Sequence, residues 1–171
     1  MSFELRLATP RDAPEIADLQ IAAWRAAFLP LLPAGFEIPP REQFLIMGER
    51  VLQEAGVERT LALADERIAG FCSHGPSRDE DAAGEVGEVR ALFVHPDYWR
   101  RGVGSALVSN SLERLRDVGF VHATVWSFRD NERANAFYER SGFGRDGTTQ
   151  AREAFGGTVE IRYRRSLEQQ G

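Results

Sequence analysis

The chain has 171 residues and contains a single cysteine, Cys72. One cysteine excludes an internal disulfide, so a reduced, cytoplasmic setting is the expected location. Cys72 lies in an apolar stretch that is typical of a strand, and free cysteine is among the most buried residue types. We therefore expect an inert, buried thiol rather than a nucleophile.

Other features are scarce as well. No apolar run approaches the roughly 18 to 20 residues that would cross a bilayer, and the first residues lack the basic, apolar and small-residue pattern of a secretory signal. The net charge of −5 argues against a nucleic-acid-binding protein. Three histidines, His74, His95 and His122, are too dispersed for a recognisable metal motif. We expect no membrane, nucleic-acid or metal partner.

What is present is ordinary for a globular protein. Hydrophobic residues make up 43% of the chain and charged residues 27%. A chain of this length favours one core, so residues 1–171 are expected to form a single domain. No internal repeat or low-complexity segment interrupts it.

Apolar periodicity and turn residues predict a mixed succession of elements. Strands are expected over 3–8, 58–64, 67–74, 88–94 and 122–126, from Phe143, and over 158–167; helices are expected from Thr9–Asp12 to Pro30, over 41–55, over 102–118 and from Asn131 to Ser141. Residues 76–87 are expected to form a mobile loop, and residues 145–157 a turn-rich connection. The order β, α, α, β, β, β, α, β, α, β, β describes a mixed α/β sheet with helices on both faces. Residues 88–126 form a βαβ unit, so its two strands should be parallel neighbours.

The most informative stretch is Glu88–Ser105, EVRALFVHPDYWRRGVGS. An apolar strand leads into a proline, a basic loop with Gly102 and Gly104, and then a helix. Backbone N–H groups at a helix N-terminus lack intrahelical partners, and glycines let an anion approach them closely. Arg100 and Arg101 add full positive charges. Alone, this pattern also fits an ordinary strand-to-helix turn.

A second block follows: Asn131–Phe143, NERANAFYERSGF. The two blocks, in this order and at this separation, resemble the GNAT superfamily of acyl-CoA-dependent N-acetyltransferases; the resemblance extends in element order over residues 3–165. It implies a mostly antiparallel central sheet with helices on both faces and one splayed parallel strand pair. It also implies acetyl-CoA as cosubstrate and direct transfer of the acetyl group to a primary amine in a ternary complex.

The resemblance assigns cofactor contacts residue by residue. The strand before the loop is expected to carry a bulge and to pair its backbone with the pantetheine arm, and the loop backbone is expected to hold the pyrophosphate. An amide and two apolar side chains of the second block would complete the site. The residues implied are Leu92, Phe93, Val94, Arg100, Arg101, Gly102, Val103, Gly104, Ser105, Asn131, Ala134 and Phe137. Trp99 stands where the family usually has arginine or glutamine, a departure from the pattern.

Two residues are implied for proton transfer. Tyr138 aligns with a tyrosine near the thioester sulfur, where a phenol can donate a proton to the departing thiolate. Glu88 matches a glutamate that deprotonates the amine, since an alkylammonium cannot attack; Glu85 is a nearby substitute. The structural alternatives are a core aromatic for Tyr138 and a hydrogen-bonded strand carboxylate for Glu88. Trp24 and Phe28, four residues apart on the first helix, are candidate substrate contacts.

Two alternatives to acetyl transfer stay open: transfer of a longer acyl group, and a CoA-binding sensor or interaction module without catalysis. The sequence does not identify the acceptor among amino acids, polyamines, antibiotics and protein amines. Specificity should come from residues 24–45, 76–87 and 145–157. The family habit also implies a possible homodimer.

Overall fold

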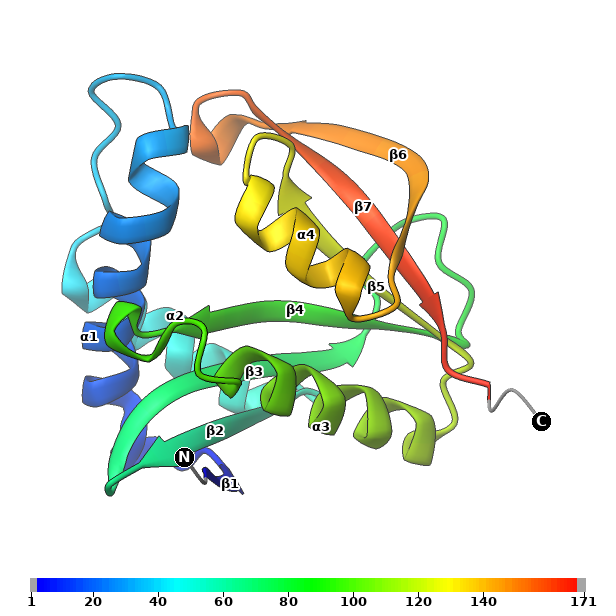
Figure 1. The fold of residues 1–171 in the computed structure, drawn as a ribbon, viewed down its shortest axis with the longest axis horizontal. Helices are drawn as coiled ribbons and strands as arrows, with labels where there is room; N and C mark the ends of the chain where they lie inside the picture. Colours follow the sequence, from blue (N-terminus) through cyan, green and yellow to red (C-terminus); the bar gives the residue numbers. More distant parts are fainter. Residues whose placement is uncertain (1–2, 169–171) are drawn as a thin grey trace.

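The computed structural model describes residues 3–168, which form one seven-stranded sheet flanked by helices (Figure 1). The strand order is β1-β2-β3-β4-β5-β7-β6, and β4–β5 is parallel whereas the other pairs are antiparallel. The strands are β1 (Glu4–Leu7), β2 (Glu58–Ala64), β3 (Arg67–Pro76), β4 (Val86–Val94), β5 (His122–Phe128), β6 (Gly144–Arg152) and β7 (Thr158–Ser166). The helices are α1 (Ala13–Ala23), α2 (Arg41–Gln53), α3 (Val103–Val118) and α4 (Glu132–Arg140).

The predicted order of strands and helices is confirmed, as are the fold class and the parallel pairing within residues 88–126. The first helix is less regular than its apolar period suggests. A 3₁₀ turn (Pro10–Asp12) leads into α1, a π-helical turn (Trp24–Phe28) continues it, and a second 3₁₀ turn (Leu29–Leu31) ends it. Such π turns often occur at functional sites.

The prediction of a turn-rich connection over 145–157 is wrong for its first half. Residues up to Arg152 belong to β6, an edge strand whose residues are mostly exposed and which pairs along β7. A polar strand exposed at the sheet edge lacks the apolar alternation by which strands are recognised in a sequence. Glu153–Phe155 then forms a short 3₁₀ turn.

The two faces of the sheet bury separate clusters, which explains the helices on both sides. Cys72 of β3 packs among α3 residues such as Leu107, whereas the next-door Phe71 packs against Ile16 and Leu19 of α1. Alternate residues of a strand point to opposite faces, so β3 supplies both clusters. The burial expected for Cys72 is confirmed, and that burial raises the pKa of its thiol to about 12.

The parallel pair β4–β5 separates part of the way along. Its register ends at Val89 opposite Val125, although β4 continues to Val94 and β5 to Phe128 (Figure 1). On the other side of β4, the register with β3 shifts between Ser73 and His74, so that Arg90 has no partner and forms a bulge. The bulge and the separation of β4 from β5 leave a V-shaped opening between these strands. Glu88 lies at its narrow end.

Within residues 3–168, no helix has the length and apolar character needed to cross a membrane. The same residues include no group of three or more histidine, cysteine or acidic side chains arranged to hold a metal ion.

Candidate active site

A cavity of about 1190 Å³ occupies the opening between the splayed strands. Its walls come from α1, the loop 77–85, β4, the start of α3, β5, α4 and the β6–β7 hairpin. Of the residues that the sequence suggests, the following line it: Trp24, Phe28, Glu88, Leu92, Phe93, Val94, Arg100, Gly102, Val103, Gly104, Ser105, Asn131, Ala134, Phe137 and Tyr138. Arg101 and Glu85 do not line it.

The start of α3 is shaped by two glycines. Gly102 caps the helix with a φ of 88°, in the left-handed region that favours glycine. A Cβ on Gly104 would lie 3.4 Å from the Phe137 ring, so the absent side chain keeps α3 and α4 close together. The first backbone N–H groups of α3 have no intrahelical acceptor and lie at the cavity wall. This end of the cavity therefore fits an anionic ligand.

Trp99 and Arg133 form a stacked pair beside that helix start. The Trp99 indole Nε1 donates to the carbonyl of Val94 at 2.8 Å, and the Arg133 guanidinium lies 3.4 Å from the centre of the indole ring. Within residues 3–168, neither Arg133 nor Arg100 pairs with a carboxylate. Burial and the charge of Arg100 lower the pKa of Arg133. Two uncompensated cations thus line the anion-binding end.

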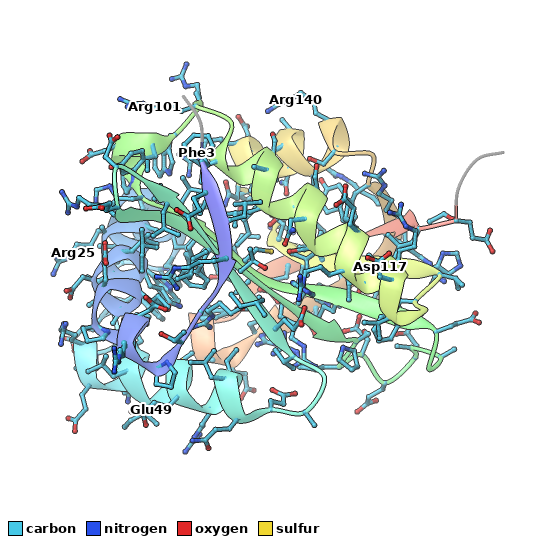
Figure 2. All side chains as sticks on the ribbon, turned by 90° about the horizontal axis from the view of Figure 1, so that it is seen from below. Phe3, Arg25, Glu49, Arg101, Asp117 and Arg140 are labelled. Carbon is cyan, nitrogen blue, oxygen red and sulfur yellow. The ribbon has the colours of Figure 1, made fainter. Side chains whose placement is uncertain are left out.

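Arg101 points away from this site. Its guanidinium lies 5.8 Å from the centre of the Tyr98 ring, and its side chain extends outward at the edge of the molecule (Figure 2). Arg133 stands in the second block, but it was not suggested by the sequence, because the resemblance assigns only Asn131, Ala134 and Phe137 of that block to the cofactor. Arg100, the cation that the loop supplies, is thus accompanied at the site by Arg133 of α4.

Helix α4 and its cap carry four of the predicted residues, Asn131, Ala134, Phe137 and Tyr138. The Asn131 side chain accepts a hydrogen bond from the backbone N–H of Ala134 at 3.2 Å, which confirms Asn131 as the helix cap. Its side-chain oxygen is thereby used, and its amide nitrogen stays available. Ala134 and Phe137 follow on the cavity side of the helix.

Tyr138 is buried at 7% exposure, with its ring near those of Phe137, Phe143 and Tyr163. Burial raises the pKa of the phenol. Its hydroxyl makes no hydrogen bond within residues 3–168, although the residue lines the cavity. A phenol in this setting stays protonated at neutral pH, so it can donate a proton but cannot serve as a base.

Glu88 is only 2% exposed and is held by Arg78 from the loop 77–85. Arg78 Nη2 donates to Glu88 Oε1 at 2.7 Å, and the Arg78 backbone N–H donates to Oε2 at 3.0 Å. The hydrogen bond to Glu88 raises the pKa of Arg78. Glu88 is therefore a deep carboxylate covered by an arginine whose side chain is 58% exposed.

A second deep carboxylate, Glu160 of β7, was not suggested by the sequence. Its side chain is 12% exposed, accepts a hydrogen bond from Gln150 Nε2 at 2.9 Å, and lies 3.7 Å from Arg152. Burial raises the pKa of Glu160. No sequence motif marks this residue, because only the pairing of β7 with β5 and β6 brings it to the cavity.

Four aromatic side chains on the α1 side of the cavity contact one another, each packing against two of the others. Trp24 contacts Phe28 and Phe155 with centroid separations of 5.4 and 5.7 Å, and Phe128 contacts the same two residues at 5.2 and 5.3 Å. All four line the cavity. The predicted pair Trp24 and Phe28 is thus half of a larger apolar wall.

The loop 77–85 is tied down, contrary to the mobile loop expected from its composition. Arg162, 6% exposed, donates to Asp81 at 2.6 and 2.7 Å, to Asp79 at 3.1 Å and to Asp146 at 2.6 Å. The Trp126 indole adds a hydrogen bond to Asp79 at 2.9 Å. Because these partners come from β5, β6 and β7, the local sequence of the loop does not reveal them.

Comparisons with known proteins agree with this geometry. Residues 17–143 match the family model described as the acetyltransferase (GNAT) family. A mycothiol acetyltransferase of Mycolicibacterium vanbaalenii is 37% identical over 93 residues, covering 53% of this chain and 28% of the relative. An uncharacterized N-acetyltransferase of Bacillus subtilis is 28% identical over 133 residues, 74% of this chain and 72% of the relative. The chain thus spans little more than a quarter of the length of the first relative.

Solved structures share the fold over nearly the whole chain. The PaiA N-acetyltransferase of Thermoplasma acidophilum, solved in complex with coenzyme A, has a TM-score of 0.73 and 18% identity, covering 97% of this chain and 99% of that one. An acetyltransferase of Salmonella typhimurium, solved with its cofactor acetyl-CoA, has a TM-score of 0.76 and 17% identity, covering 100% and 97%.

Proposed function

The chain belongs to the GNAT acetyltransferase family, and from that premise we propose that it transfers the acetyl group of acetyl-CoA to a primary amine by direct attack. The observation that carries the proposal is the splayed β4–β5 pair, whose opening runs from the α3 N-terminus to Glu88 and contains Tyr138. The relatives solved with coenzyme A or acetyl-CoA support the choice of cosubstrate.

The residues present fit an acyl-CoA. The unpaired N–H groups at the start of α3, with Arg100 and Arg133 beside them, would bind the pyrophosphate and phosphate groups. Beyond Val89, the β4 backbone at Leu92–Val94 is free of β5 and can pair with an extended amide-bearing arm. Bound there, acetyl-CoA supplies the activated acetyl group.

The protein's own groups would then move protons. Glu88, a carboxylate at the narrow end of the opening, accepts a proton from the incoming ammonium. Tyr138 donates a proton to the departing thiolate. The backbone N–H near Val94 is proposed to polarise the acetyl carbonyl. Cys72 takes no part in this mechanism because its thiol is buried and protonated.

Calorimetric titration with acetyl-CoA, joined to a thiol-release assay over a panel of amines, tests the function. We expect binding of acetyl-CoA and release of CoA that depends on an added amine. The chain contains no lysine, so CoA released without acceptor does not report acetylation of its own side chains. Binding without turnover of any amine would favour a sensor, faster turnover of longer acyl-CoAs would revise the acyl donor, and absence of binding would refute all three.

Replacing Arg133 with glutamine is expected to weaken acetyl-CoA binding about tenfold, because a cation facing a phosphate contributes on the order of 1.4 kcal/mol or more. The loss should be smaller for dephospho-CoA if Arg133 meets the 3′-phosphate. Titration calorimetry measures both. Arg116→Gln, at an exposed position of α3 outside the cavity, is the matched control. Equal affinities of the Arg133 variant and the unmodified protein would remove Arg133 from the cofactor site.

Replacing Glu88 with glutamine is expected to lower kcat/KM about 100-fold at pH 6–7 and less at pH 9. Without a carboxylate, the reaction depends on the free amine already in solution, which becomes scarcer as the pH falls. The measurement is a pH–rate profile for one amine, with Glu85→Gln as control, since Glu85 is exposed and outside the cavity. An unaltered profile would count against Glu88 as the base.

A further inference from the structure

We propose that the acceptor is a small zwitterionic amine, an α-amino acid with an apolar or aromatic side chain. This inference deepens the proposed function and rests on it. It is carried by four charged side chains, Arg78, Glu88, Arg152 and Glu160, and by the aromatic wall of the same cavity.

The carboxylates lie deep and the arginines lie toward solvent. Glu88 and Glu160 have side chains 3% and 12% exposed, whereas those of their partners Arg78 and Arg152 are 58% and 47% exposed. Within these two pairs, the deep carboxylates and the more exposed arginines orient a ligand that carries both signs. The ammonium enters first, toward the splayed strands, and the ligand's own carboxylate stays near the opening.

Arg78 and Arg152 both have N–H donors that make no hydrogen bond to the glutamates. Arg78 uses Nε and Nη2 on Glu88, and Arg152 approaches Glu160 through Nε. Within residues 3–168, the Nη1 atoms of both side chains make no hydrogen bond or ion pair. A guanidinium has five N–H donors, so each arginine can keep its glutamate and also receive a carboxylate. Two further cavity arginines, Arg90 and Arg162, are nearly buried and engaged elsewhere.

One deep acceptor atom is also available. Glu160 Oε2 receives Gln150, while Oε1 has no hydrogen-bond donor within residues 3–168. An ammonium has three N–H donors and can be shared by Glu160 and Glu88.

Charge balance at the two arginine–glutamate pairs favours the zwitterion over a simple cation. The two arginine–glutamate pairs sum to zero charge, and an α-amino acid adds none. A polyamine or an alkylammonium brings no carboxylate for the two exposed arginines and adds positive charge beside them, which costs affinity. An amino acid amide or a peptide N-terminus would leave those arginines without the carboxylate that the geometry accommodates.

The aromatic wall indicates what the rest of the ligand is. Trp24, Phe28, Phe128 and Phe155 form a continuous apolar surface on the cavity. Such a surface favours an apolar or aromatic substituent on the amine and does not favour a polar one.

The test is a matched substrate series at saturating acetyl-CoA, measured by CoA release: L-phenylalanine, L-phenylalaninamide and phenethylamine, then L-leucine, L-leucinamide and isopentylamine, with spermidine added. These compounds keep the side chain and change the carboxylate. We expect kcat/KM for the amino acids to exceed that for the amides and decarboxylated amines by about 10- to 100-fold, the range of a charge-assisted hydrogen-bonded contact.

Substitutions of the two arginines test whether these residues cause the preference for a carboxylate. Arg78→Gln and Arg152→Gln should each raise KM for the amino acid and so lower the ratio of kcat/KM for L-phenylalanine to that for phenethylamine, with the affinity for acetyl-CoA little changed. Arg116→Gln, outside the cavity, should leave the preference intact.

The outcomes separate this inference from the function it rests on. Turnover of the amides, decarboxylated amines or spermidine as fast as the amino acids would overturn the zwitterionic acceptor and leave the acetyltransferase standing. Failure to bind acetyl-CoA would instead overturn the proposed function. The substrate series uses the unmodified protein, so an unfolded variant does not affect its result.

Discussion

Tyr138→Phe is expected to lower kcat by about 100-fold or more while leaving the affinity for acetyl-CoA almost unchanged. The substitution removes one hydroxyl and keeps the ring that packs between Phe137 and Phe143. That hydroxyl has no hydrogen-bond partner within residues 3–168, so its loss should cost little stability. The proposed cost arises only in the transition state, where the thiolate leaves without a proton donor.

Single-turnover and steady-state kinetics, joined to calorimetric titration with acetyl-CoA, measure this prediction. Tyr163→Phe is the matched control, because Tyr163 is fully buried outside the cavity and its hydroxyl contacts Arg145 and Glu139 instead. It should leave kcat unchanged. If Tyr138→Phe also turns over at the unmodified rate across the pH range, Tyr138 is a core aromatic and has no part in the chemistry.

Arg162→Gln is expected to lower the free energy of unfolding by about 3 kcal/mol, because it leaves the largely buried carboxylates of Asp79 and Asp146 without their cation. For a chain of this size, this corresponds to a fall in melting temperature of about 6–12 °C. The variant should also free the loop 77–85, which carries Arg78, and so raise KM for the acceptor. Thermal unfolding and amide exchange in the loop measure the two effects.

The sign of the pH dependence follows from the carboxylates. The hydrogen bond from Arg162 lowers the pKa of Asp81; burial works to raise that of Asp146, but contacts with Thr148 and Arg162 outweigh it and lower that pKa as well. A lowered folded-state pKa gives stability at pH values above the ordinary carboxyl pKa of 3.8, which is lost as the pH falls through the folded-state value. The difference between Arg162→Gln and the unmodified protein should therefore shrink in acid.

Arg41→Gln supplies the control for Arg162. Arg41 pairs with Asp18 at 2.6 Å, but both side chains are exposed, at 47% and 61%. Such surface pairs contribute little, so the melting temperature should stay close to that of the unmodified protein. An equally small effect of Arg162→Gln would show that the loop is held by other contacts.

The sequence predicted most of the fold because most of it follows from local patterns. Apolar periodicity and turn residues located four helices and the seven strands, and the glycine loop located the start of α3. A strand was expected from Phe143, but the extension of β6 to Arg152 was missed, because a polar edge strand is specified by its partner β7 rather than by its own alternation. The composition of residues 76–87, rich in acidic and small residues, predicts a mobile loop because it does not reveal a buried arginine over 80 positions away.

The candidate site divides in the same way. Glu88, Tyr138 and the loop glycines stand in short motifs, so the sequence by itself determined the family, the cofactor end and the residues proposed for proton transfer. Only the tertiary structure brought Arg78, Arg133, Arg152 and Glu160 to the cavity, and it moved Arg101 out of it. The physical reason is that backbone geometry and glycine conformation are local properties of a segment. The charge of a cleft depends instead on strand register and loop docking, which join segments that are distant in the chain.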